Sequence, residues 1–170
     1  LNEDGLAVED VAAHKQEKGG VQGFPGAQFV PGGAELLEHP CDILVPAAME
    51  GVISQDNAGN IRTNVIAEAA NGPVSYEADR ILNEKGIFIL PDAFLNAGGV
   101  TVSYFEWVQD RMGYFWTEDI VNSRLEQTMV TAYNEVDACR KKYDVSMRTA
   151  SYILAIGRVA EVYRLRGVFA

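Results

Sequence analysis

Short apolar segments in the first half of the chain predict β-strands at 42–46, 65–67 and 87–90. Each is bounded by residues that favour turns, and continuous apolar runs of this kind are typical of strands covered on both faces of a parallel sheet. Between the last two segments, Ala78, Ile81 and Leu82 follow helical spacing and predict a helix at 75–85. We therefore expect a strand, a helix and a parallel strand joined by a right-handed crossover.

Helical patterns dominate the second half of the chain, where no strong strand signal follows Asp92. Long helices are predicted at 97–112, 118–143 and 146–166, with Thr117 at the N-cap of the second. Nearer the N-terminus, a helix at 7–18 should stop at Gly19-Gly20 and lead into a Gly- and Pro-rich loop with short extended pieces at 21–33. The predicted fold class is α/β, with part of a doubly wound parallel sheet followed by long C-terminal helices.

Composition predicts an ordinary folded domain and argues against some partners. The 170 residues are 48% hydrophobic and 22% charged, which suffices for a real core. The net charge is -10 and no long run of Lys and Arg occurs, so we expect no nucleic-acid surface. No apolar run approaches the roughly 20 residues that cross a bilayer, and no secretion signal opens the chain, so we expect no membrane association and a cytoplasmic location.

The residues that most often bind metals or exchange protons are scattered. Cys41 and Cys139 lack CxxC spacing and are expected to be reduced structural thiols. His14 and His39 have no partners at ligand spacing, so no metal site is expected. The lysines in helical contexts are expected to be solvated rather than catalytic: Lys15, Lys18, Lys85, Lys141 and Lys142.

The segments that follow the predicted strands are candidates for ligand contact, because open α/β sheets bind ligands beyond the carboxyl ends of their strands. The small residues Ala47 and Ala48 would let a planar ring approach the backbone closely. Asn71 offers an amide donor and an amide acceptor, which suit a carboxamide. An ordinary turn is the alternative interpretation, since Asn-Gly is a common turn dipeptide.

A second candidate segment begins at Asn96, ahead of Gly98 and Gly99. Two glycines at a helix start would leave backbone N–H groups open to an anion or an amide. Val100 and Ser103 follow Asn96 on one helical face, within about 60° of it. Taken alone, a hydroxyl such as that of Ser103 inside a helix more often bonds to the preceding turn than to a ligand.

In order and spacing, these two segments resemble the nicotinamide end of the coenzyme domain of glutamate dehydrogenases. The first segment is Val65-Ile66-Ala67-Glu68-Ala69-Ala70-Asn71-Gly72-Pro73, and the second runs from Asn96 to Glu106 as Asn-Ala-Gly-Gly-Val-Thr-Val-Ser-Tyr-Phe-Glu. The likeness covers essentially the whole chain and is strongest from Cys41 to Glu106. One departure is Ala69, where many members of the family have Gly.

The resemblance implies roles for particular residues. Asn71 and Asn96 would border the nicotinamide and the substrate, and the turn with Ala47 and Ala48 would contact the coenzyme. Val100 and Ser103, together with Asn96, would line the substrate site. Residues 1–112 would then be part of a Rossmann-type dinucleotide-binding domain, and residues 113–170 its C-terminal helices.

The implied activity is the NAD- or NADP-dependent oxidative deamination of L-glutamate to 2-oxoglutarate and ammonia, by an enzyme that is usually a hexamer. No GxGxxG turn is present in these residues, and the catalytic lysines and aspartate of the family belong upstream, so no catalytic residue is expected here. Leu1 opens directly onto a turn-like segment, which suggests a chain cut in mid-fold that would be inactive alone. The preference between NAD and NADP stays open.

Two other functions remain in view. A leucine, phenylalanine or valine dehydrogenase shares this coenzyme domain, although a hydroxyl at Ser103 would serve an enzyme for apolar side chains poorly. A non-catalytic ligand-binding or assembly module derived from the family is the third possibility. The missing glycine-rich turn and lysines would favour that module if Leu1 were the natural start.

Overall fold

The computed structural model describes residues 1–31 and 33–167, which form two compact units. The first unit ends at His39 and contains α1 (Val8–Lys18) and α2 (Ala34–Leu37). As predicted, α1 stops at Gly19, whose φ of 77° is readily adopted only by glycine. Within the same unit, the His14 ring packs edge-on against Phe24, so this histidine has a structural contact.

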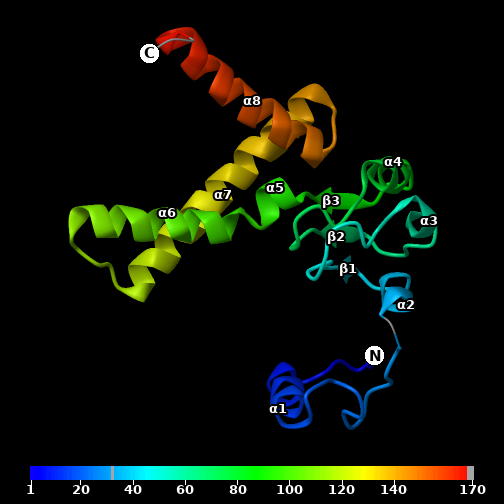
Figure 1. Ribbon diagram of the computed structural model, residues 1–170. Helices are drawn as coiled ribbons and strands as arrows, with labels where there is room; N and C mark the ends of the chain where they lie inside the picture. The colour runs from blue at the N-terminus through cyan, green and yellow to red at the C-terminus, as the bar shows by residue number, and fades with distance from the viewer. Residues whose placement is uncertain (32, 168–170) are drawn as a thin grey trace. The chain divides into compact units, whose positions relative to one another are not determined.

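The second unit, from Pro40 onward, is built on a parallel sheet. Its strands are β1 (Ile43–Leu44), β2 (Val65–Ala67) and β3 (Phe88–Leu90), paired in that order (Figure 1). Helix α4 (Tyr76–Glu84) connects β2 to β3, and the Ser75 hydroxyl caps it by accepting from the Ala78 N–H at 3.2 Å. The predicted α/β class and the strand-helix-strand unit are confirmed.

Both faces of the sheet are largely covered at β2 and β3, as apolar strands require, whereas Ile43 on β1 is 60% exposed. Ile66 at the centre of β2 is fully buried, as are Ala78 and Leu82 on α4. Along β3 the side chains alternate, so Phe88 and Leu90 pack against the cluster formed by the helices that follow.

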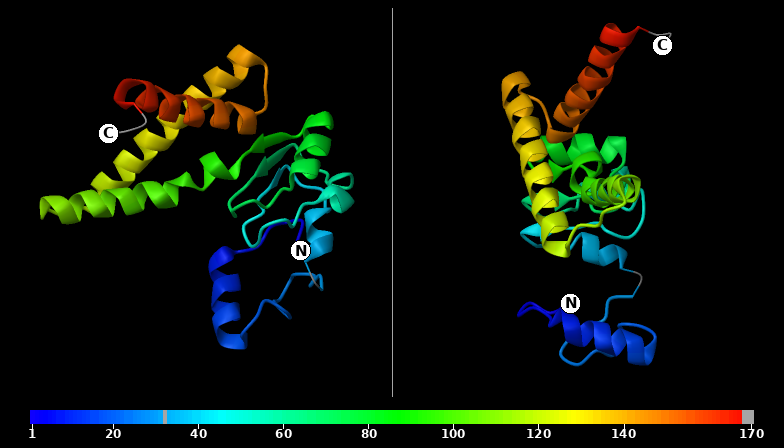
Figure 2. Two further views of the ribbon diagram at one scale, coloured as in Figure 1. Left: turned by 45° about the horizontal axis from the view of Figure 1, so that its top comes forward. Right: turned by 90° about the vertical axis from the view of Figure 1, so that its left-hand side faces the viewer.

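Three long helices complete the second unit: α6 (Ala97–Met112), α7 (Glu118–Tyr143) and α8 (Met147–Arg166). Their bounds agree with the predicted ones to within one residue. Helix α7 packs against both α6 and α8, and α8 also contacts β3 (Figures 1 and 2). At the turn between α6 and α7, the Gln109 side chain accepts a hydrogen bond from the Trp116 N–H at 2.6 Å.

Several local features were not predicted. Four-residue helices occur at α2, α3 (Gln55–Ala58) and α5 (Asp92–Leu95), and no strand forms between 21 and 33 within the described residues. Thr117 occupies the N-cap of α7, but its side chain makes no capping hydrogen bond. The predicted division into part of a dinucleotide-binding domain (1–112) and its C-terminal helices (113–170) stays a prediction. The two compact units meet elsewhere, between His39 and Pro40.

Lys85 is exposed, as expected, but it also makes hydrogen bonds that were not predicted. Its ammonium group does not simply extend into solvent, because Nζ donates to the carbonyl oxygens of Gly59 and Ile61, both at 2.7 Å. These carbonyls follow α3, so the lysine joins the end of α4 to the segment after α3. These contacts give Lys85 a structural role, and its lack of a catalytic role stays a prediction.

Candidate functional site

An open hollow of about 630 Å³ lies beyond the carboxyl ends of the strands in the second unit. Segments that follow β1 and β2 line it together with the start of α6: Ala47, Ala48, Met49, Glu50, Ala69, Ala70, Asn71, Asn96 and Val100. This edge is where open α/β sheets bind ligands. The structure thus brings together five of the six residues proposed from the sequence, and Ser103 is the one outside the lining.

At one edge of the hollow, two asparagine side chains form a direct pair. The Asn96 Nδ2 donates to the Asn71 Oδ1 at 2.7 Å and to the Ala70 carbonyl oxygen at 3.3 Å. Because a carbonyl can only accept, this contact fixes which end of the Asn96 amide is the NH₂ group. Within the described residues, the Asn71 Nδ2 and the Asn96 Oδ1 have no protein partner, which leaves one donor and one acceptor for a ligand.

The loop that carries Asn71 is held by backbone contacts on both sides. Gly72 has a φ of 55°, and its carbonyl oxygen accepts from the Gly51 N–H at 2.8 Å. On the other side, the Gly72 N–H donates to the Asp92 Oδ2 at 2.8 Å. The Ala70 N–H donates to the Pro46 carbonyl oxygen at 3.0 Å, which connects the exits of β2 and β1. Hydrogen bonds from other segments thus hold the backbone on both sides of Asn71 without a ligand.

The start of α6 differs from the sequence expectation. Asn96 ends α5 and immediately precedes α6, with φ and ψ of -86° and 0°, so one helix leads into the next. Its side chain makes no capping hydrogen bond and instead reaches Asn71. The Gly99 N–H already donates to the Asn96 carbonyl at 3.2 Å. Of the two glycine N–H groups at this helix start, that of Gly99 is therefore already paired.

Val100 and Ser103 extend the same face of α6 away from the amide pair. Val100 lines the hollow and is 69% exposed, whereas Ser103 is exposed but lies beyond the lining residues. The nearby Thr101 hydroxyl donates to the Ala97 carbonyl at 2.8 Å, which is the usual structural bond of a helical hydroxyl. Within the described residues Ser103 makes no such bond, so its hydroxyl is available.

A charged cluster behind the hollow was missed by the sequence analysis. Arg148, in the first turn of α8, contacts the carboxylates of Glu68 at 2.5 Å, Asp79 at 2.8 Å and Asp92 at 3.4 Å. Burial lowers the pKa of Arg148, but hydrogen bonds and charge from Glu68 and Asp79 outweigh it, so the pKa lies above its ordinary value. One signal was available, because a cation in the first turn of a helix opposes the helix dipole and so suggests a nearby acid.

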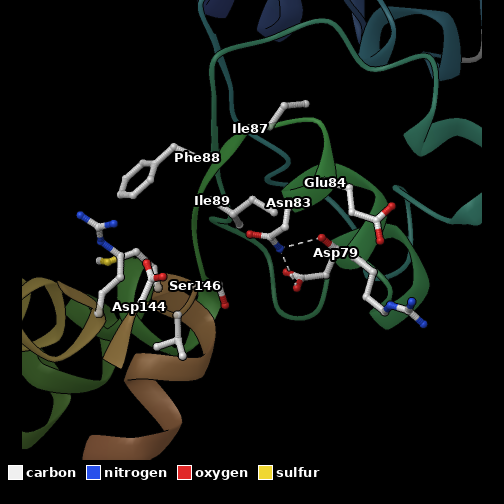
Figure 3. Close-up of a pocket in the computed structure, with 13 residues that line it drawn as sticks. Asp79, Asn83, Glu84, Ile87, Phe88, Ile89, Asp144 and Ser146 are labelled. Atoms are coloured by element: carbon white, nitrogen blue, oxygen red, sulfur yellow. Dashed lines mark hydrogen bonds between the residues drawn. The ribbon is translucent and has the colours of Figure 1, made fainter. Parts of the chain in front are cut away.

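A second open cleft, of about 550 Å³, lies on the opposite side, where β3 begins (Figure 3). Some of its polar groups are engaged within the protein: the Asn83 Nδ2 donates to the Asp79 Oδ2 at 3.0 Å, and Ser146 caps α8. The amino ends of strands are also not the usual ligand edge. The hollow with the amide pair is therefore the better candidate site.

Other kinds of site find no support in the part of the chain that the structure describes. It contains no group of three or more side chains arranged to hold a metal ion. Among the same residues, none of the helices combines the length and the apolar character needed to span a bilayer.

Comparison with known proteins identifies the family. The model of the Glutamate/Leucine/Phenylalanine/Valine dehydrogenase family matches residues 1–167. The chain belongs to this family of amino-acid dehydrogenases. The resemblance inferred from the two asparagine-bearing segments is thereby confirmed.

Relatives in this family include several glutamate dehydrogenases. The chain is 49% identical to that of Thermotoga maritima over 168 residues, which cover 99% of the chain and 40% of the relative. A crystal structure from Peptoniphilus asaccharolyticus has a TM-score of 0.82 at 37% identity, over 99% of the chain and 37% of that structure. A hetero-hexameric enzyme from Thermus thermophilus, in a Leu-bound form, has a TM-score of 0.90 at 29% identity, over 100% of the chain and 40% of that structure. The chain thus spans about 40% of the length of the relatives it matches.

Proposed function

We propose that the chain forms the nicotinamide side of the active site in a glutamate dehydrogenase. The complete enzyme would convert L-glutamate to 2-oxoglutarate and ammonia with NAD or NADP. The observation that carries this proposal is the Asn71–Asn96 pair at the carboxyl edge of the parallel sheet. Similarity to the Thermotoga maritima glutamate dehydrogenase supports the choice of substrate. Acid-base groups would come from the remaining 60% or so of such an enzyme, and the present chain alone would be inactive.

The amide pair fits the carboxamide of a nicotinamide ring. A carboxamide has one carbonyl acceptor and one NH₂ donor, which match the Asn71 Nδ2 and the Asn96 Oδ1 respectively. Two such bonds would fix the rotation of the ring and hence the face it presents to the substrate. The small side chains of Ala47 and Ala48 leave room for a planar group over the same hollow. When bound, NAD or NADP would supply the acceptor for the hydride.

The face of α6 would then meet the substrate. Val100 would contact its aliphatic carbons, and the free Ser103 hydroxyl would donate to the side-chain carboxylate. A leucine, phenylalanine or valine dehydrogenase remains the alternative within the family, and a non-catalytic ligand-binding or assembly module the alternative outside catalysis. An apolar substrate has no acceptor for Ser103, so this residue discriminates between the enzymes.

The test compares substrates in the complete polypeptide that carries these residues. NADH or NADPH formation is measured with L-glutamate, L-leucine, L-phenylalanine and L-valine for the wild type, for Ser103→Ala and for a matched control, Ser123→Ala on the exposed surface of α7. We expect turnover of glutamate, and an increase in KM for glutamate of about tenfold in S103A alone, the value of one hydrogen bond to a charged group. Preference for leucine, phenylalanine or valine would favour the alternative enzyme, and no turnover of any amino acid would favour the module.

Assembly and location are further parts of the proposal. We expect the complete enzyme to be a hexamer in the cytoplasm, with support from the likeness to a subunit of the hetero-hexameric Thermus thermophilus enzyme. Light scattering coupled to size-exclusion chromatography measures the subunit number directly. A monomer or dimer at assay concentration would contradict the hexamer without affecting the assignment of the nicotinamide site.

A further inference from the structure

The charged cluster around Arg148 reaches the hollow through a continuous set of hydrogen bonds. Arg148 Nη2 donates to the Glu68 Oε1, and the Glu68 Oε2 accepts from the Asp92 N–H at 2.8 Å. Asp92 in turn accepts from the Gly72 N–H through Oδ2 at 2.8 Å. Gly72 directly follows Asn71, so each step from the arginine to the amide pair is a defined contact.

Asp92 connects to the other asparagine as well. Its carbonyl oxygen accepts from the Asn96 N–H at 3.2 Å, across the single turn of α5. Asp92 therefore contacts the loop of Asn71 through its side chain and the residue Asn96 through its backbone. The relative position of the two amide groups depends on where Asp92 lies.

Arg148 is the cation that allows three acids to gather at this point. Glu68, Asp79 and Asp92 all lie within 4.0 Å of its guanidinium group, and Glu68 is completely buried. Without the guanidinium, the carboxylates would repel one another at short range in a region of low dielectric constant. Asp92 is the least buried of the three, so its side chain is the one most able to move away.

We propose that Arg148 is a positioning residue for the nicotinamide site: by holding Asp92 against the Gly72 N–H, it fixes the spacing of Asn71 and Asn96. This inference depends on the proposed function of the amide pair. Arg148 does not line the hollow and acts only through Asp92. A purely structural role, in which the arginine merely fastens α8 to the sheet, predicts a different outcome in binding.

The experiment compares NAD with ADP-ribose, which lacks the nicotinamide ring. Dissociation constants of both are measured by calorimetry on the complete polypeptide for the wild type, Arg148→Met and Arg148→Lys. The matched control is Arg158→Met, since Arg158 lies on the same helix and pairs with Glu135 at the surface. We expect R148M to bind NAD about tenfold more weakly with ADP-ribose unchanged, R148K to fall between, and R158M to behave as wild type.

Other outcomes separate the two proposals. If R148M loses affinity for both ligands equally, or for neither, the positioning role is overturned, while the proposal of a nicotinamide site stands. If the wild type binds NAD no more tightly than ADP-ribose, and N71A binds both ligands as the wild type does, the proposed site and this inference are overturned together. If R148M does not fold, Asp92→Asn is measured in its place. This variant removes the charge that Arg148 holds, so its affinity for NAD must fall relative to its affinity for ADP-ribose.

Discussion

Replacing Arg148 by Met should destabilise the second unit strongly, because it isolates a buried charge. Glu68 has no exposed surface, and its two carboxylate oxygens accept from Arg148 at 2.5 Å and from the Asp92 N–H at 2.8 Å. Met matches the length of the arginine stem but donates no hydrogen bond. Removing one partner of a buried ion pair typically costs about 3–5 kcal/mol, and we expect a loss in that range.

Glu68→Gln provides the second side of a double-mutant cycle. Glutamine keeps the shape and one acceptor, but it loses the charge-assisted bond to Arg148, which is worth about 1.5–3 kcal/mol. The double variant R148M/E68Q removes the fully buried charge of Glu68 together with its partner, while Asp79 and Asp92, which are partly exposed, keep their charges. Its loss of stability should therefore fall short of the sum of the two single losses by roughly 2 kcal/mol or more.

Urea unfolding followed by tryptophan fluorescence is suited to this cycle. The chain has two tryptophans, Trp107 and Trp116, and both belong to the second unit, so the signal reports the unit that contains the cluster. The control R158M breaks an exposed ion pair and should change stability by about 0.5 kcal/mol at most. Additive losses in the cycle, or a loss below about 1 kcal/mol in R148M, would refute the account of a coupled buried pair.

Further predictions concern packing, charge and ligand discrimination. Leu82→Ala should reduce unfolding free energy by about 2–5 kcal/mol in the same urea assay, since Leu82 is fully buried, whereas Leu165→Ala at a site 79% exposed should have little effect. Hydrogen bonds from Lys141 and Arg140 lower the pKa of Asp137 in the folded protein. Its stabilising effect is therefore fully present above the pKa of the unfolded chain, about 4, and is lost as the pH falls through the lower pKa of the folded protein. Thermal melts of wild type and D137N should therefore differ at neutral pH and converge in acid; a constant difference would contradict this. Asn71→Asp keeps the acceptor for Asn96 but removes the free donor and adds a negative charge. The affinity for NADH, whose nicotinamide ring is neutral, should therefore fall about tenfold more than the affinity for NAD, whose ring is cationic. The surface control N122D should change neither affinity.

Regular elements of this fold could be predicted from the sequence because their side-chain periods are clear. The long helices have enough turns to show a helical pattern, and β2 and β3 are apolar because both of their faces are largely covered. Helices α2, α3 and α5 contain one turn each, which is too short for a pattern to emerge. Their positions depend on tertiary contacts, as with the Lys85 ammonium that binds the carbonyls after α3.

The candidate site could be predicted to the level of segments but not of contacts. Strand exits converge at one edge of any parallel sheet, so Ala47, Ala48 and Asn71 were placed together by topology alone. The bond between Asn71 and Asn96 could not be predicted, because it depends on α5, which turns the chain between β3 and α6. The roles of these residues toward coenzyme and substrate remain predictions.

Glu68 is buried because the backbone at this edge needs its acceptor, and not because its ion pair with Arg148 adds net stability. A buried ion pair contributes little net stability compared with apolar residues of the same volume, so the pair with Arg148 is not explained by folding energy. The loops that carry the amide pair, however, present the N–H groups of Gly72 and Asp92, and Glu68 and Asp92 supply their acceptors. Apolar residues at 68 and 92 would leave these N–H groups without acceptors at about 1–3 kcal/mol each and release the loops. The acids therefore hold the site in shape, and Arg148 is the charge that makes their proximity possible.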